Sequence, residues 1–376
     1  MIARHVKLKT NRRTKADLDK LLWHLTGCYN WAIKTIALRK DAGLPYSEFD
    51  IHGLLSGHSN KTGVSSRALQ GTVHQAFQSW ERCWAKQNKK PHLKGKRNKL
   101  NSICYRGDAR LNSDQNTIKI PGFPKLRYHR HTKGLPKGKI AAQVTVIKKT
   151  SGWYAVLLFD RNHEQVVLAT NSAIGIDTGF KNLVTTSNGE VFEHPQELRK
   201  SAAQLARVQR GGSKKRAARL HEKICNQRKD RNHKISHAVV RDNKEIYVTN
   251  DNLRGQARRF GKSIASAAVA QLRNFIIYKG SNCGRKVELV DSRYTTMSCS
   301  ACEARTGPTG LRNLNIRNWE CLACGAKHDR DVNAAINVLK SGQRYCLEEA
   351  AQVLKTAKPL KKLGRKTKSC AGRATT

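Results

Sequence analysis

Four cysteines in the C-terminal third of the chain have the spacing of a metal site. They form two C-x-x-C pairs separated by 18 residues: Cys299, Cys302, Cys321 and Cys324. Each pair can fold into a tight knuckle that presents two thiolates to one tetrahedral metal ion, as in a zinc ribbon. A redox-active C-x-x-C is disfavoured, because two pairs lie within one short segment. Four cysteine ligands close the coordination shell, so we expect a structural rather than a catalytic Zn²⁺.

Two aspartates outside this segment occupy positions that suit a metal-dependent reaction. Asp177 ends a short apolar strand in I-G-I-D-T-G, and Asp331 opens a helix in H-D-R-D-V-N-A-A, where it could also be a favourable first-turn charge. An acid on the first strand of a hairpin and another at a later helix start is how RNase H-like nucleases assemble a pair of Mg²⁺ ions. Mg²⁺ prefers hard oxygen ligands, and two such ions stabilise the attacking and leaving oxygens during phosphodiester cleavage.

These motifs resemble those of the TnpB family, the OrfB-type transposon proteins that are RNA-guided DNA nucleases related to type V CRISPR effectors. The matching stretches are I-G-I-D-T-G-F-K-N-L-V-T-T-S-N-G-E, Y-T-T-M-S-C-S-A-C, N-W-E-C-L-A-C-G-A-K-H-D-R-D-V-N-A-A-I-N-V-L and, more loosely, P-H-L-K-G-K. The C-terminal set is very specific to the family. The resemblance makes Asp177 and Asp331 the first and last acids of a RuvC-like catalytic site, and the four cysteines zinc ligands.

The middle acid of the family does not transfer cleanly to this chain. Family members commonly carry a glutamate after the fourth strand, where this sequence has Thr249 or Asn250. Some relatives place that glutamate before the tyrosine-threonine motif, where this sequence has Ser292. Three acids could substitute for it, and we rank them in the order Asp251, Asp291 and Glu288. If none of them reaches the metal ions, two carboxylates would hold Mg²⁺ poorly, and the protein would bind DNA without cutting it.

The resemblance also implies a multidomain α+β architecture that positions these groups. The expected parts are a wedge-like β-barrel (1–12 and 98–170) with a helical recognition insert (13–97), an RNase H-like (RuvC) α/β domain (171–295 and 328–342), an inserted zinc ribbon (296–327) and a basic tail (343–376). The tail is poor in apolar residues, so we expect it to be disordered.

Local patterns support this order of elements. Apolar residues at three- and four-residue spacing predict helices over 14–42 and 65–87, and we expect Trp80 and Trp84 in the second helix to pack in a core rather than stack on bases. Apolar runs bounded by turn residues predict strands over 2–8, 117–120, 140–146 and 153–159. Farther along, the patterns predict a hairpin with S-N-G-E as its turn, a basic helical stretch over 195–242, strands over 246–248 and 287–290, and a helix over 262–279.

The composition indicates a polyanionic partner. The chain has 376 residues, and 72 Lys and Arg against 27 Asp and Glu give a net charge of +45. A basic surplus of this size indicates nucleic acid rather than a small acidic metabolite. The expected contacts lie in the loop 89–97 and in the long basic helical stretch: Lys94, Lys96, Arg97, Lys214, Lys215, Arg216 and Arg219.

Other features exclude a membrane or secreted protein. No apolar run approaches the roughly 20 residues that span a bilayer, and the N-terminus lacks the apolar segment of a signal peptide. The remaining seven cysteines have no partner at ligand spacing, and the cysteine count fits a reducing cytoplasm. They are Cys28, Cys83, Cys104, Cys225, Cys283, Cys346 and Cys370.

We therefore expect an RNA-guided DNA endonuclease of transposon origin that acts with a guide RNA on double-stranded DNA and depends on Mg²⁺. The main alternative is a nuclease-dead, guide-directed DNA-binding protein such as a repressor, and a third is a basic zinc-ribbon protein that binds RNA or the ribosome. The sequence leaves the oligomeric state open.

Overall fold

The computed structural model describes residues 2–106, 110–112, 114–129, 135, 140–159, 172–179, 182–193, 197–253, 255, 258, 261, 267–310, 313 and 315–356. The chain divides into two compact units, which are described separately. The first comprises Met1–His163 with Val208–Glu222, and the second comprises Glu164–Arg207 with Lys223–Thr376.

The first unit is built on a seven-stranded antiparallel sheet with the strand order β2-β6-β7-β1-β5-β4-β3. The N-terminal strand lies inside the sheet and pairs with β7 and β5, as its alternating sequence predicts. Strands β2, β3 and β5 were not predicted. The strands are β1 (Ile2–Lys9), β2 (Ser102–Arg106), β3 (Arg110–Asn112), β4 (Thr117–Lys119), β5 (Leu126–Tyr128), β6 (Ile140–Lys149) and β7 (Gly152–Phe159).

Four helices lie between β1 and β2, and three of them, α1, α2 and α4, share one hydrophobic core with this sheet. The two long ones match the predicted helices, and the two short ones were not predicted: α1 (Arg12–Asp41), α2 (Glu48–Gly53), α3 (His58–Thr62) and α4 (Ser66–Trp84). Trp80 is buried, and its indole nitrogen donates to the carbonyl of Ile33 (3.1 Å). Its ring stacks on that of Trp84, so the core packing predicted for these tryptophans is confirmed.

The second unit contains a mixed five-stranded sheet with the order β10-β9-β8-β11-β12. Its first three strands are antiparallel and include the predicted hairpin, whereas β8, β11 and β12 run parallel. This order places β8, which carries Asp177, at the centre of the sheet. The strands are β8 (Ala173–Thr178), β9 (Asn182–Thr186), β10 (Val191–Glu193), β11 (Glu245–Thr249) and β12 (Lys286–Val290).

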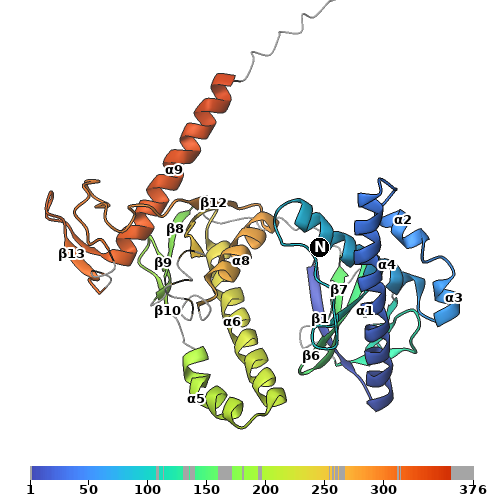
Figure 1. Cartoon of the computed structure of the whole chain (residues 1–376). Helices are drawn as coiled ribbons and strands as arrows, with labels where there is room; N and C mark the ends of the chain where they lie inside the picture. The colour runs from blue at the N-terminus through green and yellow to red at the C-terminus, as the bar shows by residue number, and fades with distance from the viewer. Residues whose placement is uncertain are drawn as a thin grey trace, which may run out of the picture. The chain divides into compact units, whose positions relative to one another are not determined.

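Helices cover both faces of the five-stranded sheet (Figure 1). Residues of α6 (Lys214–Asp242) and α8 (Val269–Asn282) pack on one face, and α9 (Arg330–Thr356) packs on the other. The predicted basic helical stretch is two helices, because α5 (Glu197–Arg210) ends before a turn at Gly212, whose φ of +68° is readily adopted only by glycine. No helix in the described ranges is both long and apolar enough to cross a membrane.

The expectation of a disordered tail is wrong for its first part. Helix α9 continues to Thr356, so residues 343–356 are helical. The physical reason is composition, since C-L-E-E-A-A-Q-V-L is rich in residues of high helix propensity, which allow the preceding helix to continue. Residues 357–376 lie outside the described residues.

Candidate metal sites

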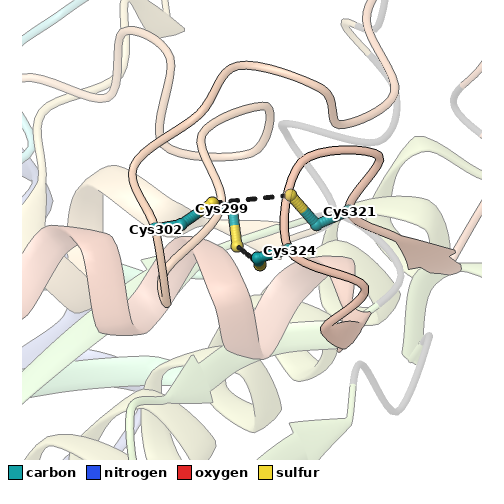
Figure 2. Close-up of side chains that lie close together, drawn as sticks. All are labelled: Cys299, Cys302, Cys321 and Cys324. Atoms are coloured by element: carbon teal, nitrogen blue, oxygen red, sulfur yellow. Dashed lines mark hydrogen bonds between the residues drawn. The ribbon is translucent and has the colours of Figure 1, made fainter.

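The four cysteines predicted as metal ligands converge on one point in the second unit (Figure 2). Their sulfurs all lie within 4.8 Å of one another, with Cys302 and Cys321 at 3.6 Å and Cys299 and Cys324 at 3.7 Å. A tetrahedral shell with zinc–sulfur bonds places neighbouring sulfurs about 3.8 Å apart. The quartet can therefore hold one tetrahedral metal ion without rearrangement of its backbone.

Two further side chains lie against the cysteine quartet. The hydroxyl of Thr306 donates to Sγ of Cys321 (3.2 Å), which lowers the pKa of that thiol and favours the thiolate form that a metal binds. Nε2 of His328 lies 3.0 Å from Sγ of Cys299, on the short hairpin of β13 (Asn318–Glu320) and β14 (Lys327–Asp329). Both side chains contact sulfur directly, and neither was predicted.

Helix α9 fastens the first cysteine knuckle through polar side chains one and two turns apart. Asn333 is buried, and it accepts from the backbone N–H of Ser300 (2.8 Å) and donates to the carbonyl of Ser298 (2.8 Å). Asn337 donates to the same Ser298 carbonyl (2.7 Å), and the Lys340 amine donates to the carbonyl of Ser300. The knuckle is thus held to the helix that begins with Asp331.

Asp177 lies near the end of β8, where the strand runs between β9 and β11. It pairs in register with Thr185 of β9. The strand can approach α9 closely because it contains Gly175: a Cβ there would lie 2.1 Å from the carbonyl oxygen of Ala335. The glycine of I-G-I-D therefore brings the first acid and the helix of the last acid together.

Thr249 and Asp251 both face this end of β8. Thr249 is the buried last residue of β11, and its hydroxyl lies 3.0 Å from that of Thr178. The Thr178 hydroxyl also lies 3.2 Å from Oδ2 of Asp251, to which it donates. Asn250 turns elsewhere and accepts from Arg273 (3.0 Å). Of the two residues at the expected glutamate position, Thr249 thus faces this end of β8 and Asn250 does not, and Asp251 is bonded to the same Thr178 hydroxyl as Thr249.

Asp331 lies in the first turn of α9, but it does not cap the helix. Asp329 does so, because its carboxylate accepts from the backbone N–H groups of residues 331 and 332 (2.9 and 3.0 Å). The carboxylate of Asp331 is free to accept from Asn182 of β9 (3.2 Å) and twice from Arg317 (2.8 and 3.1 Å). Neither Asn182 nor Arg317 was predicted as a site residue.

Asp251 and Asp331 both act electrostatically on Asp177. Burial, followed by the negative charges of Asp251 and Asp331, raises the pKa of Asp177 to about 7. Among the described residues, the groups of three or more metal-ligating atoms within 4.8 Å of one another contain only cysteine and histidine. The oxygens of the three carboxylates are therefore not all within 4.8 Å of one another.

The other two candidate acids are not among the charges that act on Asp177. Asp291 is exposed, and its carboxylate pairs with Arg293 (3.5 Å). Glu288 lies opposite Tyr247 in the register of edge strand β12, and its charge acts on Lys286. Of the three candidate substitutes, the first-ranked, Asp251, is thus the one whose charge acts on Asp177 together with that of Asp331.

The predicted basic contacts are on the surface. Asn30 holds the backbone of Lys94 with two hydrogen bonds (2.7 and 2.8 Å), and the amine of Lys94 lies over the ring of Tyr29. The other six predicted contacts are exposed, two of them in the loop after α4 and four in the first turns of α6: Lys96, Arg97, Lys214, Lys215, Arg216 and Arg219.

Comparison with known proteins places the chain in a family. One family profile, described as "Probable transposase" (OrfB_IS605), matches residues 156–259, and another, "Cas12f1-like, TNB domain", matches residues 270–338. A "Putative RNA-guided DNA endonuclease" of Streptomyces pristinaespiralis is 32% identical over 296 residues, which cover 74% of this chain and 72% of the relative. The InsQ protein of Escherichia coli K12, of the same printed name, is 25% identical and is covered over 79% of each chain.

A more distant relative is the "CRISPR-associated endodeoxyribonuclease Cas12f1" of Sulfoacidibacillus thermotolerans. It is 26% identical over 226 residues, which cover 53% of this chain and 52% of the relative. The site and these similarities define a transposon-encoded protein with a carboxylate centre and a cysteine ribbon. The chain belongs to the TnpB family, so the resemblance drawn from its motifs is confirmed.

Proposed function

We propose that this protein is an RNA-guided DNA endonuclease that cleaves phosphodiester bonds with Mg²⁺ at Asp177, Asp251 and Asp331. The observation that carries the proposal is the electrostatic environment of Asp177, where burial, followed by the negative charges of Asp251 and Asp331, raises the pKa to about 7. A buried carboxyl group whose ionised form is destabilised by burial and by neighbouring acids is typical of a site built for cations. The names of the relatives and the net charge of +45 support guide RNA and double-stranded DNA as partners.

The chain's own groups would prepare this centre for reaction. Bound Mg²⁺ would stabilise the charges that develop on the attacking and leaving oxygens. Asn182 and Arg317 hold the Asp331 carboxylate in place, and the Thr178 hydroxyl holds that of Asp251. Arg317 also neutralises Asp331 in the absence of metal, so its side chain must share or release that carboxylate when a cation binds.

The domain assignment is part of the proposal. We assign the five-stranded sheet with α6, α8 and α9 to a RuvC-like nuclease domain, and the seven-stranded sheet to a wedge barrel with α1–α4 as its recognition insert. The central position of β8, with the first acid at its end, supports the first assignment. The cysteine quartet would hold a structural Zn²⁺ in a ribbon that loads the target strand.

A nuclease-dead, guide-directed DNA-binding protein is the second candidate function. One observation favours it: neither residue at the expected glutamate position is an acid, and Thr249 is buried and bonded to Thr178, whereas Asn250 is bonded to Arg273. In that case Asp251 would serve the fold only, and guide-dependent binding would persist without cleavage.

Cleavage of plasmid DNA by the protein with its co-purified RNA separates the two functions. We expect guide-dependent cleavage in Mg²⁺ that falls about 100-fold or more in Asp251→Asn, because a lost metal ligand costs several kcal/mol of transition-state stabilisation. Asp291→Asn is the matched control, since it removes an exposed acid outside the carboxylate centre. Tight guided binding without cleavage by the wild-type protein, in Mg²⁺ or Mn²⁺, would establish the second function instead.

A further inference from the structure

A second group of metal-ligating side chains lies in the first unit, far along the sequence from the cysteine quartet. His24 and Cys28 come from α1, and His58 is the first residue of α3. One nitrogen or sulfur atom from each residue lies within 4.8 Å of the other two. From this convergence we propose that His24, Cys28 and His58 form a second zinc site, which neither the family similarity nor the proposed nuclease function requires.

The distances within the group match a metal shell. The Nε2 atoms of His24 and His58 are 3.1 Å apart, and Sγ of Cys28 is 3.9 Å from Nε2 of His58. A tetrahedral shell with zinc's usual bond lengths places two nitrogens about 3.3 Å apart and a nitrogen and a sulfur about 3.6 Å apart. His24 and Cys28 lie one helical turn apart on the same side of α1, so they can bind one ion together.

The protonation states of the ligands are compatible with this role. Burial and the neighbouring His58 lower the pKa of His24, so its imidazole is neutral and offers a lone pair. Burial raises the pKa of the Cys28 thiol, and zinc binding would therefore release a proton from it. Two imidazoles and one thiolate are borderline to soft donors, which favour Zn²⁺ over Mg²⁺ or Ca²⁺.

The fourth coordination position would face a pocket of about 760 Å³. The pocket is lined by the three ligands, by Trp23 and Trp31, and by the cations of Lys20 and Lys94. Asn30 also lines the pocket, but its amide nitrogen donates to the carbonyl of Lys94 and its amide oxygen accepts from the backbone N–H of Lys94. Among the residues that the structure describes, no further histidine, cysteine or carboxylate lines the pocket, so a water molecule would complete the shell.

The proposed ion would stabilise an element that the hydrophobic core does not hold. Helix α3 has five residues, none of them buried, and glycines in the left-handed conformation flank it at Gly57 and Gly63. A helix of this length is not stable in isolation. A metal bond from His58 to α1 would fix the start of α3 against the long helix. Without the metal, one hydrogen bond between His24 and His58 would be the main link.

Zinc content of the full-length chain tests the proposal. We expect two zinc ions per wild-type chain after removal of loosely bound metal. His58→Ala, which removes a ligand of the second site, and Cys302→Ser, which removes a ligand of the cysteine quartet, should each leave one ion. His52→Ala is the matched control, since this neighbouring histidine in α2 is outside the group and should leave two ions. A wild-type chain with one zinc, and no loss of it in His58→Ala, would overturn the proposal.

Cobalt substitution gives a second measurement that does not depend on the fold of the ribbon. In a chain with Cys302→Ser and Cys324→Ser, Co²⁺ should still produce thiolate-to-metal absorption from Cys28, and adding Cys28→Ser should abolish it. Zinc should also slow amide hydrogen exchange in residues 58–62 of the wild type and not of His58→Ala. Absence of the absorption and of the exchange effect would leave a hydrogen-bonded histidine pair as the correct interpretation.

Discussion

The carboxyl group of Asp177 lies near the end of a central strand, in a side chain that is partly buried, and the charges of two other acids act on it. Its raised pKa means that the metal-free protein keeps this group protonated up to about pH 7. An ion that binds there must displace the proton, so Mg²⁺ affinity should rise with pH until the group is fully ionised. Arg317 lowers the affinity for Mg²⁺, because its guanidinium competes with the metal ion for the Asp331 carboxylate.

Asp177→Asn should make the metal-free protein more stable at alkaline pH. A carboxyl group with a raised pKa favours the folded state most when it is protonated, below its unfolded pKa of about 4, and that advantage is lost as the pH rises through about 7. We expect no pH-dependent gain for the variant near pH 4 and a gain on the order of 1–2 kcal/mol near pH 8, after allowance for solvent screening.

Urea unfolding at both pH values, without and with Mg²⁺, measures this effect. The control is Asp291→Asn, whose carboxylate is exposed and should change stability little at either pH. Added Mg²⁺ should narrow the difference at pH 8, because the cation stabilises the ionised wild-type site. An equal gain at both pH values would mean that repulsion among the three acids does not destabilise this end of the sheet.

The sequence was informative about acids and thiols and much less so about their partners. Asp177, Asp331 and the cysteines stand in motifs with fixed spacing, and Asp251 followed from adjacency to the expected position. Arg317, Asn182 and Asn333 are common residue types whose contacts span 14 to 149 residues of chain. Cys28 was assigned no metal partner because His58 lies 30 residues away on another helix. Only the asparagines of D-V-N-A-A-I-N, repeated one turn apart in a helix they disfavour, gave a usable signal.

At the scale of elements, close contact between β8 and α9 sets the geometry of the carboxylate centre. Gly175 removes the side chain that would separate the strand from the helix, and Gly342 does the same beside the ring of Tyr247, where a Cβ would lie 2.1 Å from a ring carbon. Both glycines have ordinary backbone angles, since neither has a positive φ. Space, rather than backbone conformation, is therefore what selects glycine at these two positions.

Gly175→Ala should destabilise the second unit strongly. The added methyl would lie 2.1 Å from the carbonyl oxygen of Ala335 and 2.7 Å from the backbone nitrogen of Leu339, and backbone atoms cannot yield as a flexible side chain does. We expect a loss of about 3 kcal/mol or more, together with weaker cleavage, because the two aspartates would be pushed apart.

A matched glycine isolates the effect of this contact in a thermal or urea unfolding experiment. Gly27 lies exposed in the middle of α1, and a methyl group added there would have no neighbouring atom within 4 Å. Gly27→Ala should therefore stabilise the protein by about 0.5–1 kcal/mol. If Gly175→Ala left stability unchanged, the close contact between the sheet and the helix would not be required for stability.

Long amphipathic elements were predictable from periodicity, and short or composite ones were not. Helices α1 and α4 and strands β4, β6, β7, β11 and β12 lie where apolar spacing indicated. Helices α2 and α3 have too few turns to show a period, and their positions depend on side-chain contacts rather than on a buried stripe. The β3 and β5 strands, of three residues each, are defined only by their neighbours in the sheet.

At the scale of the whole molecule, the charge of +45 dominates how the protein meets its partners. A guide–target heteroduplex of about 20 base pairs carries about 40 phosphates, and a guide scaffold adds more. The surplus thus fits a protein that contacts an extended ribonucleoprotein. Four of the predicted contacts are grouped and exposed in the first turns of α6, where they form one basic patch: Lys214, Lys215, Arg216 and Arg219.

Replacing all four residues of this basic patch by alanine should weaken nucleic-acid binding and its salt dependence together. Each lost phosphate contact lowers the slope of log affinity against log salt concentration by about 0.7–0.9, so the full set should lower it by about 3. Fluorescence anisotropy with guide RNA across a salt series measures the slope. The control replaces Lys214 and Lys215 by arginine and should retain the slope, whereas a patch variant with an unchanged slope would exclude these residues from the interface.

Helix α9 carries an acid of the carboxylate centre and also binds the cysteine knuckle. This limits how the two sites can be exchanged by recombination or design. Its first turn carries Asp331, and Asn333 and Asn337 in its next turns hydrogen-bond to the backbone of the cysteine knuckle. The same helix packs against Gly175 of β8. The cysteine ribbon consequently cannot be replaced independently of helix α9. A chimera that exchanges residues 296–327 with those of another protein would keep both cysteine pairs and still misplace them, unless the donor's backbone carbonyls met the two asparagines of the recipient.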